Sequence, residues 1–212
     1  MVIAIDGPAG AGKSTVARAL AGRLEFTYLD SGAMYRCVAL ASLRADVDLG
    51  DPGAVAPIAE GLQLSMAGGA VLLADEDVSS EIREPRVSAA ASQVSVHAGV
   101  RAAMVTQQRA LVSQGGWVAE GRDIGTVVCP QAPLKVFLTA SEPERARRRA
   151  AQTGEPPGQV LAQQRSRDER DREREHGALR PADDSVEIDT TGLTLEQVVD
   201  RIAELAAARR LA

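Results

Sequence analysis

The 212-residue sequence is poor in cysteine, histidine and aromatic residues. Two cysteines, Cys37 and Cys129, are too few for a disulfide framework, and two histidines are too few for a histidine-rich metal site. We expect both cysteines to pack in the core. Aromatic residues make up only 2% of the chain, which argues against the base-stacking surfaces of proteins that bind single-stranded nucleic acid.

Long hydrophobic runs are also missing. No stretch approaches the roughly 18 uncharged apolar residues of a membrane span, and the N-terminus lacks the basic segment and cleavage site of a secretion signal. We therefore expect a cytoplasmic protein that binds no membrane. The formal net charge is −5, although residues 142–180 carry 10 Arg against 8 Asp and Glu. This local excess indicates an anion site more than a nucleic-acid footprint.

Short apolar runs alternate with helical patterns along most of the chain. The runs expected to form buried parallel strands are 2–5, 27–30, 117–120, 134–138 and 186–189. Segments 14–24 and 98–114 have helical periodicity. The alternation predicts an α/β protein, with helices on both faces of a twisted parallel sheet.

Three stretches stand apart from this alternation. Residues 46–87 have the pattern of a hairpin with Gly68 and Gly69 in its turn, and we expect a small inserted lobe there. The glycines and prolines of 152–159 predict a mobile loop between two arginine-rich helices. Thr194 and Gln197 have the spacing of a capping box that starts the last helix.

The strongest motif follows the first apolar run, where residues 6–16 read DGPAGAGKSTV. Gly7, Gly12, Lys13 and Ser14 match the P-loop pattern between a strand and a helix. Glycines let successive backbone N–H groups face a polyphosphate, and the helix N-terminus adds partial positive charge. Lys13 would reach the β and γ phosphates and Ser14 would bind Mg²⁺. The residues expected to contact ATP here are Gly7, Pro8, Ala9, Gly10, Ala11, Gly12, Lys13, Ser14 and Thr15.

A plain glycine-rich turn is the alternative explanation of this motif. Only 2 of the 24 cationic residues are lysines, however, and one of them stands at the P-loop position. A compact ammonium group is therefore favoured there over the guanidinium group used elsewhere.

Four further stretches bear on the acceptor: DSGAMYR at 30–36, ASQVS at 91–95, EGRDIGTVV at 120–128 and RDERDRER at 167–174. Ser31 is expected to cap a helix where the second strand ends. On a helix, Arg167, Asp171 and Arg174 fall within about 60° of one another, so two guanidinium groups flank one carboxylate. The charged residues between them are expected to form a solvated face; they are Asp168, Glu169, Arg172 and Glu173.

Together with the P-loop, these stretches resemble the bacterial cytidylate kinase family of nucleoside monophosphate kinases. The resemblance implies a P-loop NTPase-type three-layer α/β sandwich with a five-stranded parallel sheet, an inserted antiparallel NMP-binding lobe and a short lid. It implies a core of 1–45 and 88–212, a lobe of 46–87 and a lid segment of 150–166. The implied reaction transfers the γ-phosphoryl group of ATP, with Mg²⁺, to CMP or dCMP.

The resemblance also implies roles for particular residues. Arg36 would bind the acceptor phosphate, with Ser31 and Tyr35 lining the pocket. The cytosine edge would be recognised by three residues, namely Ser92, Arg101 and Asp123; these donor and acceptor types match cytosine rather than uracil. On the helix stripe, Arg167 and Arg174 would bind phosphate and Asp171 would bind the ribose hydroxyls.

The negative charge of the transferring phosphoryl group would be neutralised by Lys13, Arg122 and Arg149, and Arg122 would also contact CMP. By resemblance to monophosphate kinases generally, Arg145 would stack on adenine. Glu120 ends a strand at the carboxyl edge of the sheet and would hold Mg²⁺ through a water molecule; a structural pairing with Arg122 is the alternative. Which of Arg147, Arg148 and Arg149 reaches the phosphoryl group stays open, and a basic helical surface is the alternative.

The acceptor phosphate is already an anion with a second pKa of roughly 6, so the reaction needs no general base. Alignment, charge neutralisation and closure of the lobe and lid would suffice. A P-loop kinase for UMP, shikimate or dephospho-coenzyme A is one alternative, and a nucleotide-gated RNA- or DNA-binding switch is another. We expect a monomer whose partners are ATP and CMP or dCMP, without nucleic acid.

Overall fold

The computed structural model describes residues 1–67 and 70–211, so the expected hairpin glycines Gly68 and Gly69 lie outside the described residues. The chain divides into two compact units. The first comprises 1–29 and 112–212, and the second comprises 30–111. The second unit is longer than the 46–87 insert expected from the sequence because flanking helices pack within it. The boundaries of a separately moving lobe stay a prediction.

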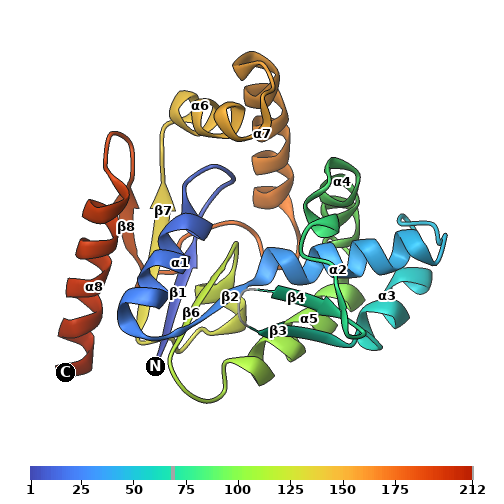
Figure 1. The fold of residues 1–212 in the computed structure, drawn as a ribbon, viewed down its shortest axis with the longest axis horizontal. Coiled ribbons are helices and arrows are strands. Elements are labelled where there is room, and N and C mark those ends of the chain that lie inside the picture. Colours follow the sequence, from blue (N-terminus) through green and yellow to red (C-terminus); the bar gives the residue numbers. More distant parts are fainter. Residues whose placement is uncertain (68–69, 212) are drawn as a thin grey trace. The chain divides into compact units, whose positions relative to one another are not determined.

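A five-stranded sheet forms the framework of the first unit, in the order β2-β6-β1-β7-β8 (Figure 1). The strands are β1 (Val2–Asp6), β2 (Thr27–Asp30), β6 (Trp117–Gly121), β7 (Leu134–Thr139) and β8 (Val186–Asp189). β1 pairs in parallel with β6 and β7, and β7 pairs in parallel with β8. The five strands expected from the apolar runs are confirmed, as is the α/β class.

Apolar side chains explain why these runs form internal strands. Ile3, Ile5, Val118 and Leu138 are fully buried, and they belong to one core with side chains of α1 (Lys13–Leu24) and α8 (Leu195–Leu211). α1 and α8 also pack against each other. Burying such aliphatic side chains contributes about 1.5–3 kcal/mol each, so this core fixes the sheet on which the loops stand.

The central position of β1 determines where a ligand can bind. Its two neighbours, β6 and β7, lie on opposite sides of it, and the chain leaves β1 directly into the glycine-rich loop. In open parallel sheets, ligands bind beyond the carboxyl ends of the strands where the connections diverge. Asp6 and Gly121, the last residues of β1 and β6, are paired at that edge.

The remaining helices of the first unit bear out the capping box and shorten the expected loop. Thr194 N donates to Gln197 Oε1 at 2.9 Å and Gln197 N donates to Thr194 Oγ1 at 3.2 Å, which confirms the start of α8. The loop expected at 152–159 is only 154–156, between α6 (Glu142–Thr153) and α7 (Pro157–Glu173). Proline is tolerated in the first helical turn, so Pro157 begins α7 instead of extending the loop.

The second unit combines helices with a small antiparallel sheet, as the hairpin pattern predicted. Its strands are β3 (Leu64–Ala67), β4 (Ala70–Leu73) and β5 (Glu76–Asp77), in that order, and η1 (Glu81–Arg83) is a short 3₁₀ turn. Its helices are α2 (Ser31–Arg44), α3 (Pro52–Glu60), α4 (Pro85–Val94) and α5 (Ala98–Leu111). α2 packs on α4 and α3 packs on α5.

Among the described residues, no helix has the length and apolar character needed to cross a membrane.

Candidate active site

The glycine-rich loop after β1 disfavours a side chain at two points, where glycine stands. A Cβ on Gly7 would lie 2.1 Å from Leu138 O, which leaves no room for a side chain. Gly10 has a φ of +79°, in the left-handed region. α1 then begins at Lys13 without a side-chain cap and without an acidic residue in its first turn. Such a helix end offers its N–H groups and partial positive charge to an anion.

Cationic side chains gather around this loop. Lys13 is buried and its Nζ donates to Pro8 O at 2.8 Å. Burial lowers the pKa of Lys13 to about 7, and the positive charges of Arg122 and Arg167 act in the same direction, while Glu120 opposes them. Since these like charges repel one another, a polyanion bound among them would relieve both the repulsion and the cost of burial.

Buried carboxylates lie at the ends of β1 and β6. Asp6 accepts from Ile124 N at 2.8 Å and from Gly125 N at 2.7 Å, and so ties β1 to the short π-helical segment η2 (Ile124–Val128). Burial raises the pKa of Asp6 to about 6, against the effect of these two donors. Glu120 is buried at the end of β6 and accepts from the hydroxyl of Tyr28 on β2.

Arg122 connects the loop to α7. Its Nη1 donates to Gly7 O at 3.1 Å and its Nε donates to Asp171 Oδ2 at 2.8 Å. Arg174, which follows the last residue of α7, lies 3.8 Å from the other carboxylate oxygen of Asp171. Burial raises the pKa of Asp171, but Arg122, Arg174 and Arg167 outweigh it and hold the pKa below 3.8. Of the predicted stripe, Arg167 and Asp171 lie on α7, whereas Arg174 lies just past its end, because the helix stops at Glu173.

The four arginines of α6 differ in their surroundings. Arg145 is buried, and its Nη1 donates to Ala9 O at 2.9 Å and to Asp168 Oδ2 at 2.6 Å. Arg148 is held by Glu144 and by both oxygens of Thr190, and its Nη1 would lie 3.7 Å from a Cβ on Gly12. The two others, Arg147 and Arg149, are exposed.

These positions bear on two expectations. Arg145 presents no solvent-exposed face on which adenine could stack in this structure, and its predicted stacking role stays untested. The expected solvated position of Asp168 is wrong: its side chain is 2% exposed because it faces Arg145 across α6 and α7. Its expected companions in the solvated face are exposed as predicted; they are Glu169, Arg172 and Glu173.

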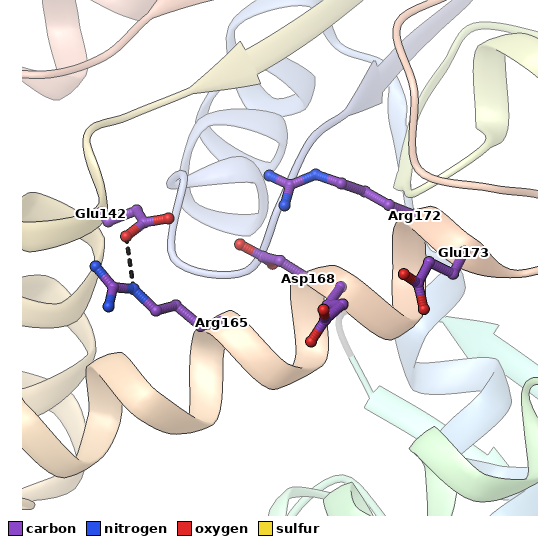
Figure 2. A pocket seen from close by; sticks show the side chains of 6 residues that line it. Glu142, Arg165, Asp168, Arg172 and Glu173 are labelled. Carbon is purple, nitrogen blue, oxygen red and sulfur yellow. Dashed lines mark hydrogen bonds and ion pairs between the residues drawn. The ribbon is translucent and has the colours of Figure 1, made fainter.

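A pocket of about 370 Å³ is lined by side chains of α7 and by Glu142 of α6 (Figure 2). Its lining consists of Glu142, Arg165, Asp168, Glu169, Arg172 and Glu173. Four carboxylates against two guanidinium groups do not suit a triphosphate. This pocket is therefore distinct in character from the cationic surroundings of Lys13.

The acceptor residues expected in the second unit gather around α2. Asp30, not Ser31, caps this helix by accepting from Ala33 N at 2.8 Å, which corrects the predicted cap by one residue. Asp30 also pairs with Arg36 at 2.9 Å. Arg101 on α5 is buried, with its guanidinium 5.8 Å from the centre of the Tyr35 ring.

Two further expected acceptor residues lie on other elements. Ser92 on α4 is half-buried and donates to Ser88 O at 3.4 Å. Asp123 is buried directly before η2 in the first unit. Ser14 and Thr15 are exposed in the first turn of α1, where their hydroxyls are open to a ligand.

Three residues beside the site escaped the sequence analysis. Asp6 immediately precedes the P-loop, and its position at the end of a strand was a usable signal. Tyr28 gave no such signal because its contact with Glu120 depends on the neighbouring placement of β2 and β6. Asp168 was recognised only as part of a charged helix face.

A parallel sheet with this loop after its central strand is the fold of a P-loop nucleotide-binding protein. A solved structure of an uncharacterized protein from Eubacterium ventriosum shares it, with a TM-score of 0.57, 12% identity and 97% of each chain covered.

Sequence comparisons are more specific. A cytidylate kinase from Solibacter usitatus is 47% identical over 99% of this chain and 93% of its own length. One from Stutzerimonas stutzeri is 46% identical over 100% of this chain and 97% of its own length. The family model described as cytidylate kinase matches residues 3–208. The chain belongs to the cytidylate kinase family.

Proposed function

We propose that this protein is an ATP-dependent nucleoside monophosphate kinase that phosphorylates CMP and dCMP. An oxygen of the acceptor phosphate forms a bond to the γ-phosphorus of ATP, the bond from that phosphorus to the bridging oxygen breaks, and ADP leaves with the electron pair. The products are ADP and CDP or dCDP. This reaction accords with membership of the family and with the relatives described as cytidylate kinases.

The observation that carries the proposal is the group of cations at the P-loop. Arg122 and Arg167 lie close enough to Lys13 for their charges to depress its pKa, in addition to the effect of burial. Phosphoryl transfer depends mainly on alignment and on opposing the charge of the transferring group, and the acceptor phosphate needs no base. We assign Lys13 and Arg122 to that charge, with the phosphates lying on the loop from Gly7 to Thr15.

One further contact to the transferring phosphoryl group of ATP would come from an arginine of α6. Arg148 is the candidate that supports this role best, because its guanidinium lies beside Gly12 while Arg147 and Arg149 are exposed. The earlier assignment to Arg149 requires that its side chain turn inward when nucleotide binds. A comparison of Arg148→Gln with Arg149→Gln separates the two, since only the correct one should lower kcat strongly.

Two oxygen ligands suit Mg²⁺, which prefers hydroxyl, carboxylate and water oxygens. Ser14 presents an exposed hydroxyl, and the buried Glu120 carboxylate acts electrostatically on Lys13. We propose that Ser14 binds the ion directly and Glu120 through water. When bound, Mg²⁺ would neutralise phosphate charge.

For the acceptor, we assign to CMP the residues that the family resemblance implies; the placement of the two units relative to each other is no part of this assignment. The group from the second unit comprises Ser31, Tyr35, Arg36, Ser92 and Arg101. The group from the first unit comprises Arg122, Asp123, Arg167, Asp171 and Arg174. The contacts of Asp171 and Arg101 with other site residues support both assignments. That the enzyme is a cytoplasmic monomer without nucleic-acid or membrane partners stays a prediction.

The test is a coupled assay of kcat/KM with Mg-ATP and CMP, dCMP or UMP, for the wild type and for Asp171→Ala. We expect CMP and dCMP to be used far better than UMP. Loss of the Asp171 carboxylate should impair CMP more than dCMP, because only CMP has the 2′-hydroxyl group. A preference for UMP or for a non-nucleotide acceptor would refute the assignment to cytosine.

A further inference from the structure

Two arginines link the P-loop to α7 in the same way. Arg145 donates to Ala9 O and to Asp168, at 2.9 and 2.6 Å. Arg122 donates to Gly7 O and to Asp171, at 3.1 and 2.8 Å. The two aspartates are three positions apart, so they lie on neighbouring parts of one helix face. Each arginine therefore connects one carbonyl of the loop with one carboxylate of the helix.

The two links differ in their access to solvent and hence to substrate. The side chains of Arg122 and Asp171 are 18% and 14% exposed, and both are proposed to contact nucleotide. Those of Arg145 and Asp168 are 4% and 2% exposed. A bound acceptor can compete for the outer pair, whereas the inner pair has no room to exchange its partners. The inner pair can therefore persist while the outer pair opens.

Apolar packing contributes little to the position of α7. The buried residues on this helix are Val160, Gln164 and Asp168, spaced by four, and only the first is apolar. Gln164 Nε2 donates to Arg145 O at 3.3 Å. A Cβ on Gly10 would lie 2.8 Å from Gln164 Nε2 and 3.0 Å from Arg145 Cβ, so the loop touches this polar stripe directly.

Polar anchoring of this kind is directional. A buried ion pair adds little net stability compared with apolar side chains of similar size, but its geometry selects one setting of the helix. A displacement of the loop at Ala9 or Gly10 must therefore be followed by Arg145 and, through Asp168, by α7. That helix carries Arg167 and Asp171, which we assign to CMP.

We infer that Arg145 and Asp168 are positioning residues that couple the donor site to the acceptor site. Occupancy of the P-loop by nucleotide sets Arg145, Arg145 sets Asp168, and α7 then presents Arg167 and Asp171 in the geometry that binds CMP. This inference rests on the proposed function for the assignment of ATP to the loop and CMP to α7. It gives Arg145 a role through the protein rather than on the adenine ring.

The experiment measures CMP binding by calorimetry with and without a non-hydrolysable ATP analogue. In the wild type, the analogue should tighten CMP binding by about 5- to 100-fold, the usual range of coupling between sites. Asp168→Asn leaves a buried guanidinium without its charge partner and can fail to fold. The variant that keeps the test decisive combines Arg145→Met with Asp168→Leu, which removes both charges while filling the space.

For this double variant we expect a melting temperature equal to or above that of the wild type. The ATP analogue should leave its dissociation constant for CMP nearly unchanged, a ratio near 1. KM for CMP should rise about tenfold at saturating ATP. The matched control is Glu142→Gln with Arg165→Gln, because this pair also joins α6 to α7, at 2.8 Å, but lies exposed at the pocket in Figure 2. The control should keep the wild-type coupling.

A wild type that phosphorylates CMP, with the same analogue effect in the double variant, would overturn the inference and leave the proposed function intact. A wild type without any analogue effect would also overturn it. A wild type that does not phosphorylate CMP overturns the proposed function together with this inference. Loss of the analogue effect in the exposed control as well would show that any contact between α6 and α7 suffices, and would overturn the special role of the buried pair.

Discussion

Replacement of Lys13 by methionine should abolish phosphoryl transfer and yet make the free protein more stable. Burial and neighbouring cations lower the pKa of Lys13 from 10.5 to about 7. Between these values the unfolded chain binds a proton that the folded protein does not, so wild-type stability falls as the pH drops from 10.5 to 7. At pH 7 the folded state is disfavoured by about 4 kcal/mol through this residue.

Lys13→Met removes this penalty, but part of the stabilisation is offset by the loss of a hydrogen bond. Lys13 Nζ donates to Pro8 O, and a buried carbonyl left without its donor costs about 1–2 kcal/mol. The net effect at pH 7 is therefore a stabilisation of about 2 kcal/mol. As the pH rises toward 10.5, the advantage of the variant should shrink and then reverse, because the unfolded chain then begins to lose its proton as well and the charge penalty on the folded wild type disappears.

The measurement is urea unfolding at pH 7 and pH 9.5, without nucleotide and with a chelator to remove divalent ions. The chain offers one matched control, since its only other lysine, Lys135, is also buried but pairs with Asp184 at 2.8 Å. Lys135→Met should destabilise at both pH values, because it removes the donor to Pro130 O at 2.6 Å together with the ion pair to Asp184. A Lys13→Met protein less stable than wild type at pH 7, or an advantage that does not depend on pH, would refute the reasoning.

Three further predictions concern neighbouring residues. Gly10→Ala should destabilise the protein by about 1–3 kcal/mol and reduce the rise in melting temperature on adding ADP. The φ of +79° strains any other residue, and a methyl group would also collide with Gln164. The control is Gly154→Ala, which has a similar φ of +74° but no atom near its Cβ. The pKa of Asp6 is raised from 3.8 to about 6, so the folded protein keeps a proton that the unfolded chain loses between these values. The stability of the wild type relative to Asp6→Asn should therefore be greatest below pH 3.8 and should fall by up to about 3 kcal/mol as the pH rises past 6. The measurement is unfolding from about pH 4.5 to 7.5. Tyr28→Phe removes the hydroxyl that donates to Glu120, and we expect about a tenfold higher Mg²⁺ concentration for half-maximal activity in a Mg²⁺ titration, with KM for CMP unchanged.

Features that depend on local sequence could be predicted. The P-loop is a local structure: its glycines, Lys13 and the following helix are adjacent in the chain, so the pattern identifies them. The reciprocal bonds of Thr194 and Gln197 are local for the same reason. The strands could be found because runs buried on both faces of a parallel sheet are continuously apolar.

What could not be predicted depends on partners distant in the chain. α7 has almost no apolar pattern, so the sequence gives no indication of which charged residue faces inward. Asp168 is buried only because Arg145, 23 positions earlier, supplies its partner. The bond between Tyr28 and Glu120 likewise spans 92 positions and requires knowledge of the strand order. Nor could the cap of α2 be assigned to Asp30 rather than Ser31, since both residue types favour that position.

The polar anchoring of α7 has a consequence for motion. A helix held mainly by oriented charges and a single buried valine can detach at a lower free energy than α1, which is embedded in the aliphatic core. Amide hydrogens in 157–173 should therefore exchange with solvent deuterium well before those in 16–21. Local opening of this one segment therefore leaves the sheet and its aliphatic core folded.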